Sequence, residues 1–184
     1  MTISLAIDTA TSRTIVGVVD NGVVVFEEFH EGATDHGKAI SELVAKALRA
    51  TAIPDQVVIG MGPGPFTGLR VGIIFAQSFA LARSIPWIGV CSLDAIRIDS
   101  STNDLSTDEY TVAIDARRKQ MYWASYKAGV RINGPAIDKP EDIPGFITNV
   151  FPDTAKLVEL SSTQNEREPI YLRSPDAIPT AQRT

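Results

Sequence analysis

The sequence has too few cysteines and histidines for several common kinds of functional site. It contains one cysteine, Cys91, so an intrachain disulfide is excluded, which either fits a reducing compartment or carries no information about the compartment. Its two histidines, His30 and His36, cannot form a histidine-rich metal site and lack the i, i+4 spacing of a metalloprotease helix. We therefore expect no metal centre of these kinds, and we interpret both histidines as unrelated surface or capping residues.

Long hydrophobic runs and an excess of basic charge are also missing. The longest apolar stretch, residues 71–82, contains Gln77 and Ser78 and is too short to span a bilayer. The opening residues MTISLAI lack the basic region of a signal peptide. The net charge of −5 argues against a domain that binds nucleic acid by charge alone. The sequence thus predicts a cytoplasmic protein without a membrane segment.

The composition is that of an ordinary globular protein, with 44% hydrophobic and 21% charged residues in a chain of 184. Apolar runs at residues 3–7, 14–19 and 23–29 predict three strands that are antiparallel neighbours. Asp20-Asn21-Gly22 separates the last two runs, and Asn-Gly is a strong hairpin signal. Further strands are predicted at residues 56–60 and 87–91.

Two helices are predicted between these strands. His36–Ala50 has the apolar spacing of an amphipathic helix, with Glu42 and Lys46 as an i, i+4 ion pair on its exposed side. Residues 67–84 predict a second helix with Thr67 as its N-cap. This second helix is apolar around nearly its whole circumference, so we expect it to be buried on more than one side.

Residues 99–109 contain one aliphatic residue and predict a boundary between two lobes, residues 1–100 and 101–184. In the second lobe, residues 110–115 and 120–127 predict two strands joined by a basic turn. The region after residue 130 is rich in proline, so it is expected to be mostly loop, with one short strand near residues 156–160.

Two strand-to-turn segments are candidates for contact with a phosphate or Mg²⁺. In Asp8-Thr9-Ala10-Thr11-Ser12 a carboxylate is followed by hydroxyl groups, an arrangement that can order a metal's water shell, although a plain polar turn has the same pattern. Asp115-Ala116-Arg117-Arg118-Lys119 lacks the glycines of a phosphate loop. The three cations suit either an anion or nucleic-acid contact, or a solvated basic turn. The loop GMGPGPFTG is not a P-loop, because no Gly-Lys-Ser/Thr follows it.

Several motifs together resemble the TsaB (YeaZ) family. They are LAIDTATS at the start, GMGPGPFTGLRVGIIFAQSFA and VCSLDAI in the middle, IDARRKQMY, and the late PIYLR. The resemblance implies an α/β fold of the two-lobed actin-like ATPase type (ASKHA, ribonuclease H-like), with mixed sheets flanked by helices. The second lobe is shorter here than in the family, so we expect it to be reduced.

The resemblance also implies a function. TsaB-like proteins are paralogues of TsaD, which transfers a threonylcarbamoyl group to the adenosine next to the tRNA anticodon. They are held to be non-catalytic, to form a heterodimer with TsaD that the ATPase TsaE joins, and to self-associate when alone. Contact with tRNA is expected only within the complex. Asp8, Thr9, Thr11 and Asp115 would then be a vestigial phosphate motif, with Ala10 where ATPases of this fold carry glycine, and no cofactor is expected.

In this family the two helices build the interface with TsaD, which we predict to be an apolar patch. Its predicted residues are Ile40, Leu43, Val44, Ala47, Gly68, Leu69, Gly72, Phe75, Ala76 and Phe79. Arginine at position 72 or 76 is then expected to abolish the heterodimer and leave the fold intact, whereas loss of folding would place these residues in the core. The main alternative is an independent actin-like ATPase or small-molecule kinase with Asp8 and Asp115 as metal-ordering carboxylates. A metallopeptidase is a third and weaker alternative.

Overall fold

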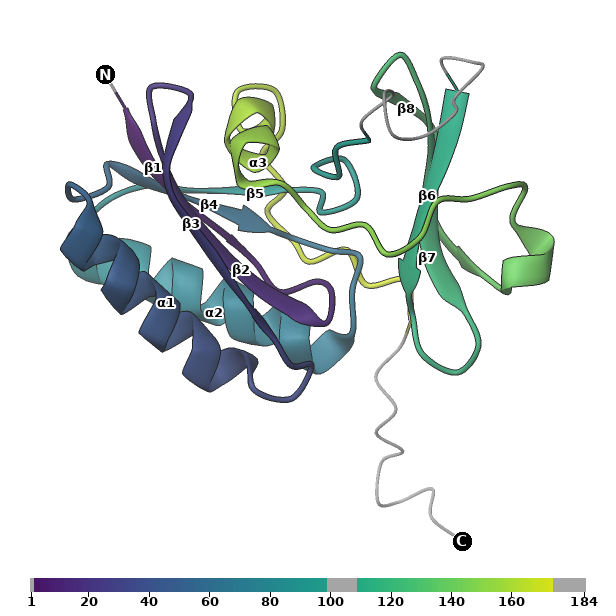
Figure 1. The fold of residues 1–184 in the computed structure, drawn as a ribbon, viewed down its shortest axis with the longest axis horizontal. Helices are drawn as coiled ribbons and strands as arrows, with labels where there is room; N and C mark the ends of the chain where they lie inside the picture. The colour runs from purple at the N-terminus through teal and green to yellow at the C-terminus, as the bar shows by residue number, and fades with distance from the viewer. Residues whose placement is uncertain (1, 99–108, 174–184) are drawn as a thin grey trace, which may run out of the picture.

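The strands of the chain form a five-stranded and a three-stranded sheet (Figure 1). The computed structural model describes residues 2–98 and 109–173. The strand order is β3-β2-β1-β4-β5 in the larger sheet and β6-β7-β8 in the smaller. The strands are Ile3–Asp8 (β1), Arg13–Asp20 (β2), Val23–Glu31 (β3), Gln56–Gly60 (β4), Trp87–Val90 (β5), Glu109–Asp115 (β6), Met121–Lys127 (β7) and Val130–Asp138 (β8).

The larger sheet is mixed. β1 pairs antiparallel with β2 and parallel with β4, and β4 pairs parallel with β5. The predicted hairpin between β2 and β3 is confirmed, because Asn21 and Gly22 have φ of 49° and 85°, the left-handed backbone that an Asn-Gly turn adopts. The smaller sheet is a meander of antiparallel strands.

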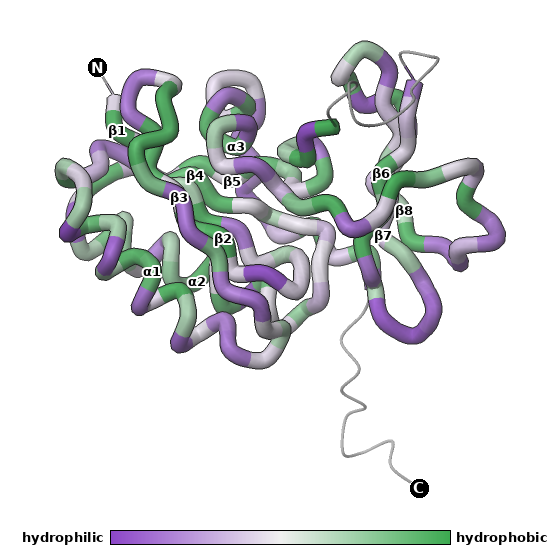
Figure 2. The backbone as a smooth tube through the Cα atoms, in the orientation of Figure 1, coloured by the Kyte–Doolittle hydropathy of each residue, from purple (hydrophilic) through white to green (hydrophobic). Residues whose placement is uncertain are grey.

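Helices cover both faces of the larger sheet. The helices are His36–Ala50 (α1), Phe66–Arg83 (α2) and Thr154–Leu160 (α3), and a short 3₁₀ turn lies at Pro140–Asp142. On one face, Leu5 and Ile59 pack with α1 and α2. On the other, Ala6 and Val58 pack with Leu157 of α3, because neighbouring residues of a strand point to opposite faces. Figures 1 and 2 show α3 on the side opposite α1 and α2, with hydrophobic strands between them.

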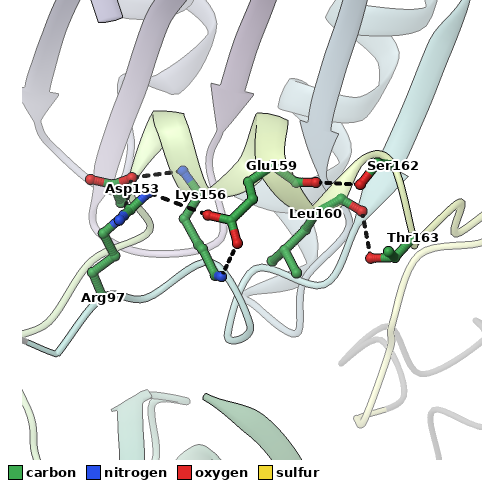
Figure 3. Close-up of polar contacts among 7 residues, drawn as sticks. All are labelled: Arg97, Asp153, Lys156, Glu159, Leu160, Ser162 and Thr163. Carbon is green, nitrogen blue, oxygen red and sulfur yellow. Dashed lines mark hydrogen bonds and ion pairs between the residues drawn. The ribbon is translucent and has the colours of Figure 1, made fainter. Parts of the chain in front are cut away.

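The strand predicted near residues 156–160 is wrong, because these residues form α3. Asp153 caps this helix, and its Oδ1 accepts the N–H of Lys156 at 2.7 Å. Arg97 donates to the same carboxylate at 2.8 Å and lies 3.5 Å from Glu159, which Lys156 also contacts at 2.6 Å (Figure 3). The helix thus begins at an Asp cap and is tied at its exposed face to the segment that follows β5.

Two local predictions for α1 and α2 also need correction. The N-cap of α2 is Pro65, with no side-chain cap bond, and Thr67 lies inside the helix. On α1, Glu42 lies 3.9 Å from Lys38, and Lys46 pairs at 2.6 Å with Glu28 of β3. Lys46 therefore ties α1 to β3 across the layers, where the sequence had predicted a pair within the helix.

The smaller sheet has a strand that the sequence did not predict, β8, in the region expected to be loop. A polar cluster joins it to the larger sheet: Asp94 accepts the hydroxyl of Tyr126 at 2.8 Å and the side-chain amide of Gln164 at 2.7 Å, and Arg131 lies 3.4 Å away. The division into lobes at about residue 100 stays a prediction. α3 follows this boundary in the chain, yet it packs on the larger sheet, whose strands all precede the boundary.

Candidate functional site

The turn after β1 is held by a buried carboxylate. Asp8 is fully buried; its Oδ1 accepts the N–H of Ala10 at 2.8 Å, and its Oδ2 accepts the hydroxyl of Ser92 at 2.6 Å. Burial raises the pKa of Asp8 to about 6, and the two hydrogen bonds oppose this shift. Ser92 lies 84 residues away, and although it belongs to the VCSLDAI motif, nothing in that motif indicates a contact with Asp8.

Thr9 joins this turn to α2. Its hydroxyl donates to the carbonyl of Gly68 at 2.9 Å. A Cβ at Gly72 would lie 2.2 Å from Thr9 Oγ1, so only glycine leaves room for this contact. Gly68 and Gly72 are therefore used for packing inside the chain, on the turn that the sequence singled out.

Burial within the chain divides the residues of the predicted interface into two groups. Phe75 and Phe79 are half-buried, but the other predicted residues are buried inside this chain. They are Ile40, Leu43, Val44, Ala47, Gly68, Leu69, Gly72 and Ala76. Arginine at position 72 or 76 is thus expected to disrupt folding, the outcome that places these residues in the core.

A groove along α1 and α2 overlaps the predicted interface at Ile40 and Phe75, and we call it the apolar groove. The groove has a volume of about 600 Å³. Ile74, on α2, is 54% exposed, and Arg70 is the charged residue of the groove, with its guanidinium 5.0 Å from the ring of Phe66. The lining residues are Gly37, Ile40, Phe66, Thr67, Arg70, Val71, Ile74, Phe75 and Ser78.

The second candidate turn, after β6, lies at the surface. Asp115 is exposed; its Oδ1 accepts the N–H of Arg117 at 2.8 Å, and its Oδ2 lies 3.6 Å from the Arg117 guanidinium. Asp115 and Thr11 line one small pocket of about 150 Å³. The structure thus brings together Thr11 and Asp115 of the predicted vestigial motif, while Asp8 and Thr9 lie in the core.

Between the larger sheet and the β6–β7 turn lies a cleft of about 470 Å³, which we call the basic cleft. Its charged lining residues are Arg117, Arg118 and Arg173, joined by His36. The interpretation of His36 as an unrelated surface or capping residue is wrong: it is only 4% exposed, and its Nδ1 lies 2.8 Å from the hydroxyl of Thr14. Burial lowers the pKa of His36.

Within residues 2–98 and 109–173, no group of His, Cys, Asp and Glu side chains could hold a metal ion. None of the helices in this part of the chain combines the length and apolarity that a membrane crossing requires.

Sequence comparison relates the chain to proteins of tRNA modification. The family model described as TsaD, tRNA N6-adenosine threonylcarbamoyltransferase, matches residues 30–174. An uncharacterized protein of Mycobacterium tuberculosis is 37% identical over 205 residues, which cover 96% of this chain and 94% of that protein. The tRNA threonylcarbamoyladenosine biosynthesis protein TsaB of Escherichia coli is 36% identical over 127 residues, which cover 67% of this chain and 54% of the Escherichia coli protein.

Structure comparison supports the predicted fold. A Pseudomonas aeruginosa protein described as similar to peptidase YeaZ superposes with a TM-score of 0.78 at 21% identity, covering 94% of this chain and 100% of that protein. YeaZ from Pseudomonas aeruginosa superposes with a TM-score of 0.73 at 21% identity, covering 88% of this chain and 91% of that protein. The α/β architecture of mixed sheets flanked by helices is therefore confirmed.

Proposed function

Because this chain belongs to the TsaD-related family, as a protein of the TsaB (YeaZ) type, we propose that it works in tRNA threonylcarbamoyladenosine biosynthesis as a non-catalytic scaffold. In this proposal it binds a TsaD-type transferase as a heterodimer in the cytoplasm, and a TsaE-type ATPase joins the pair. Contact with tRNA then occurs only within that complex, and the free chain can self-associate.

The apolar groove carries the proposal. Its lining combines Ile74, Phe75 and Val71 with a single charged residue, Arg70. An interface core is expected to be depleted in charge and to contain aromatic and aliphatic anchors. Figure 1 shows α1 and α2 side by side on one face of the larger sheet, so the groove between them is presented on a rigid support.

The turn after β1 supports a non-catalytic role. Both carboxylate oxygens of Asp8 accept hydrogen bonds from within the chain, and the side chain has no exposed surface. A carboxylate that orders a metal's water shell needs at least one oxygen open to that shell. In this arrangement Asp8 holds the turn and leaves the metal-ordering role of an ATPase unfilled.

The apolar groove is tested by substitution at its exposed anchor. Ile74→Arg is expected to weaken binding to the TsaD-type paralogue of the same organism by about thirtyfold or more, which corresponds to the ~2 kcal/mol of an interface hot spot. The dissociation constant is measured by isothermal titration calorimetry on the purified full-length chains.

Ile132→Arg is the matched control, because Ile132 is an isoleucine of similar exposure, 57% against 54%, and lies on β8 of the other sheet. Both variants should keep the thermal unfolding midpoint of the parent chain. Equal binding by the Ile74→Arg variant and the parent chain would contradict the groove as the interface.

A further inference from the structure

The apolar groove begins close to the point where the described chain ends. The ring of Tyr171 lies 4.9 Å from the ring of Phe66, which lines the groove. Phe66 and Val71 line both the groove and the basic cleft, and Arg173 lines that cleft as well. The sequence continues beyond Arg173 to Thr184. Segment 174–184 therefore starts beside one end of the groove.

The residues just before this segment are held firmly to both sheets. The N–H of Ile170 donates to the carbonyl of Met61, after β4, at 2.8 Å. Arg173 donates to the carbonyl of Ala116, in the β6–β7 turn, at 3.0 Å and to the side chain of Gln120. Segment 174–184 is thus tethered at a fixed point, and a short tether gives an effective concentration on the order of millimolar near that point.

The segment has the length to follow α2 along the groove. An extended chain advances about 7 Å over two residues, and one turn of an α-helix rises about 5.4 Å. Alternate residues of an extended segment can therefore match successive turns of a helix beside it. Residues 172–175 supply enough chain to turn into the groove. With Asp176 beside Arg70, Ile178 then lies beside Ile74, one turn further along α2.

The side chains that meet in this arrangement are complementary. Arg70 is exposed and is the charged residue of the groove; within the described residues its recorded contact is the ring of Phe66, and no ion pair is formed. Asp176 is the acidic residue of segment 174–184, so the two charges attract. Ile74 is 54% exposed, and Ile178 is the large aliphatic residue of the segment that can cover it.

Two prolines lower the entropic cost of docking. Pro175 and Pro179 have a fixed φ, and each disfavours a helical backbone at the residue before it. Ser174 and Ile178 are those preceding residues, so the segment favours the extended conformations that the match with α2 requires. A ligand already restricted to its bound conformation loses less entropy on binding.

We propose that segment 174–184 docks in the apolar groove of its own chain and competes there with the partner. Asp176 pairs with Arg70, and Ile178 packs on Ile74. The inference rests on the proposed function in one respect, because it takes the groove as the partner surface. Docking itself needs no partner, and the tether makes even a contact of about millimolar affinity substantially populated. The partner must displace the segment, which lowers its apparent affinity.

Disulfide formation in the full-length chain tests the docking. With Ile178 beside Ile74, the next turn brings Thr180 beside Ser78, an exposed residue of the groove lining. The double variant Ser78→Cys, Thr180→Cys should therefore form a disulfide within one chain in a glutathione buffer at low chain concentration, as measured by mass spectrometry of non-reduced peptides. Cys91 does not compete, because it is fully buried and burial raises the pKa of its thiol to about 11.

Two further substitutions in this double variant separate docking from chance encounter. Ile178→Asp replaces the apolar anchor by a charge and should slow disulfide formation about tenfold or more, the usual effect of losing one buried aliphatic side chain. Ala177→Asp is the matched control. It adds the same charge one residue earlier, on the side of an extended segment that faces away from the groove, so the rate should change by less than about twofold. Equal rates in all three chains, or a disulfide that joins two chains, would overturn the proposal.

Competition is measured by isothermal titration calorimetry with the TsaD-type paralogue, on chains without added cysteines. Ile178→Asp frees the groove and should tighten the heterodimer by about threefold or more, whereas Ala177→Asp should leave its dissociation constant unchanged. Binding by the Ile178→Asp variant that is no tighter than that of the parent chain would also overturn the proposal. If no chain forms a heterodimer, the proposed function fails, and the disulfide experiment still decides whether the segment docks.

Discussion

At the scale of single residues, Asp8 shows how burial changes the role of a side chain. The sequence places Asp8 at the end of a strand followed by hydroxyl residues, and this much is confirmed. Its partner Ser92 could not be predicted, because the contact joins residues 84 positions apart. The same limit applies to His36, whose burial depends on α1 and α2 packing on the larger sheet.

Burial of Asp8 also predicts how stability depends on pH. Its pKa is raised from 3.8 to about 6, with desolvation as the cause. Between these values the folded chain holds a proton that the unfolded chain has released. The contribution of Asp8 to the free energy of unfolding is therefore fully present below about pH 4 and is lost as the pH rises through about 6.

Asp8→Asn should remove this dependence, because the amide stays uncharged and keeps an acceptor for the N–H of Ala10. We expect the variant to be more stable than the parent chain at pH 7 by up to about 3 kcal/mol, and the difference to shrink towards pH 4. Urea unfolding at a series of pH values measures both. A variant that is less stable at pH 7, together with Mg²⁺-dependent ATP binding that the substitution abolishes, would instead support the independent ATPase.

At the scale of elements, strong periodicity was the most reliable guide. The bounds of α1 and β4 agree with the pattern of their apolar residues. The two-sided apolar character of α2 predicted that one side packs inside the chain, but the sequence could not say which side. The choice is made by Gly72 and Thr9, whose contact is long-range. Gly72 and Ala76 of the predicted interface accordingly lie on the side of α2 that packs inside the chain, whereas Phe75 lines the apolar groove.

α3 was predicted as a strand because a run of seven helical residues, Thr154–Leu160, is too short for a helical period to stand out. The usable signal was Asp153, a residue that favours the N-cap position. β8 was missed because glycine and proline interrupt it at Gly134 and Pro135, residues that ordinarily indicate a loop.

The cap of α3 is open to a direct test. Asp153→Ala removes the acceptor for the N–H of Lys156 and should lower the free energy of unfolding by about 1 kcal/mol. Asp153→Asn keeps an acceptor and loses the exposed ion pair with Arg97, so it should cost only a few tenths of a kcal/mol. Urea unfolding of the three chains gives the comparison. Equal losses would mean that the ion pair, and not the cap, stabilises this helix.

At the scale of the whole molecule, the fold class followed from motifs and from the alternation of strands and helices, whereas the functional surfaces needed the packed structure. The basic cleft joins residues of the β3–α1 loop, the start of α2, the β6–β7 turn and the segment ending at Arg173. No sequence pattern brings such segments together. The sequence left the β6–β7 turn open between an anion contact and a solvated turn, and this choice stays a prediction.

The central claim is that this chain is the scaffold partner of a TsaD-type transferase. The most direct test is a mass determination by light scattering, on the purified chain, on the TsaD-type paralogue of the same organism, and on their mixture. We predict a new species at the summed mass of the two chains. A mixture that contains only the two separate species, with this chain a monomer that binds ATP and Mg²⁺, would contradict the scaffold role.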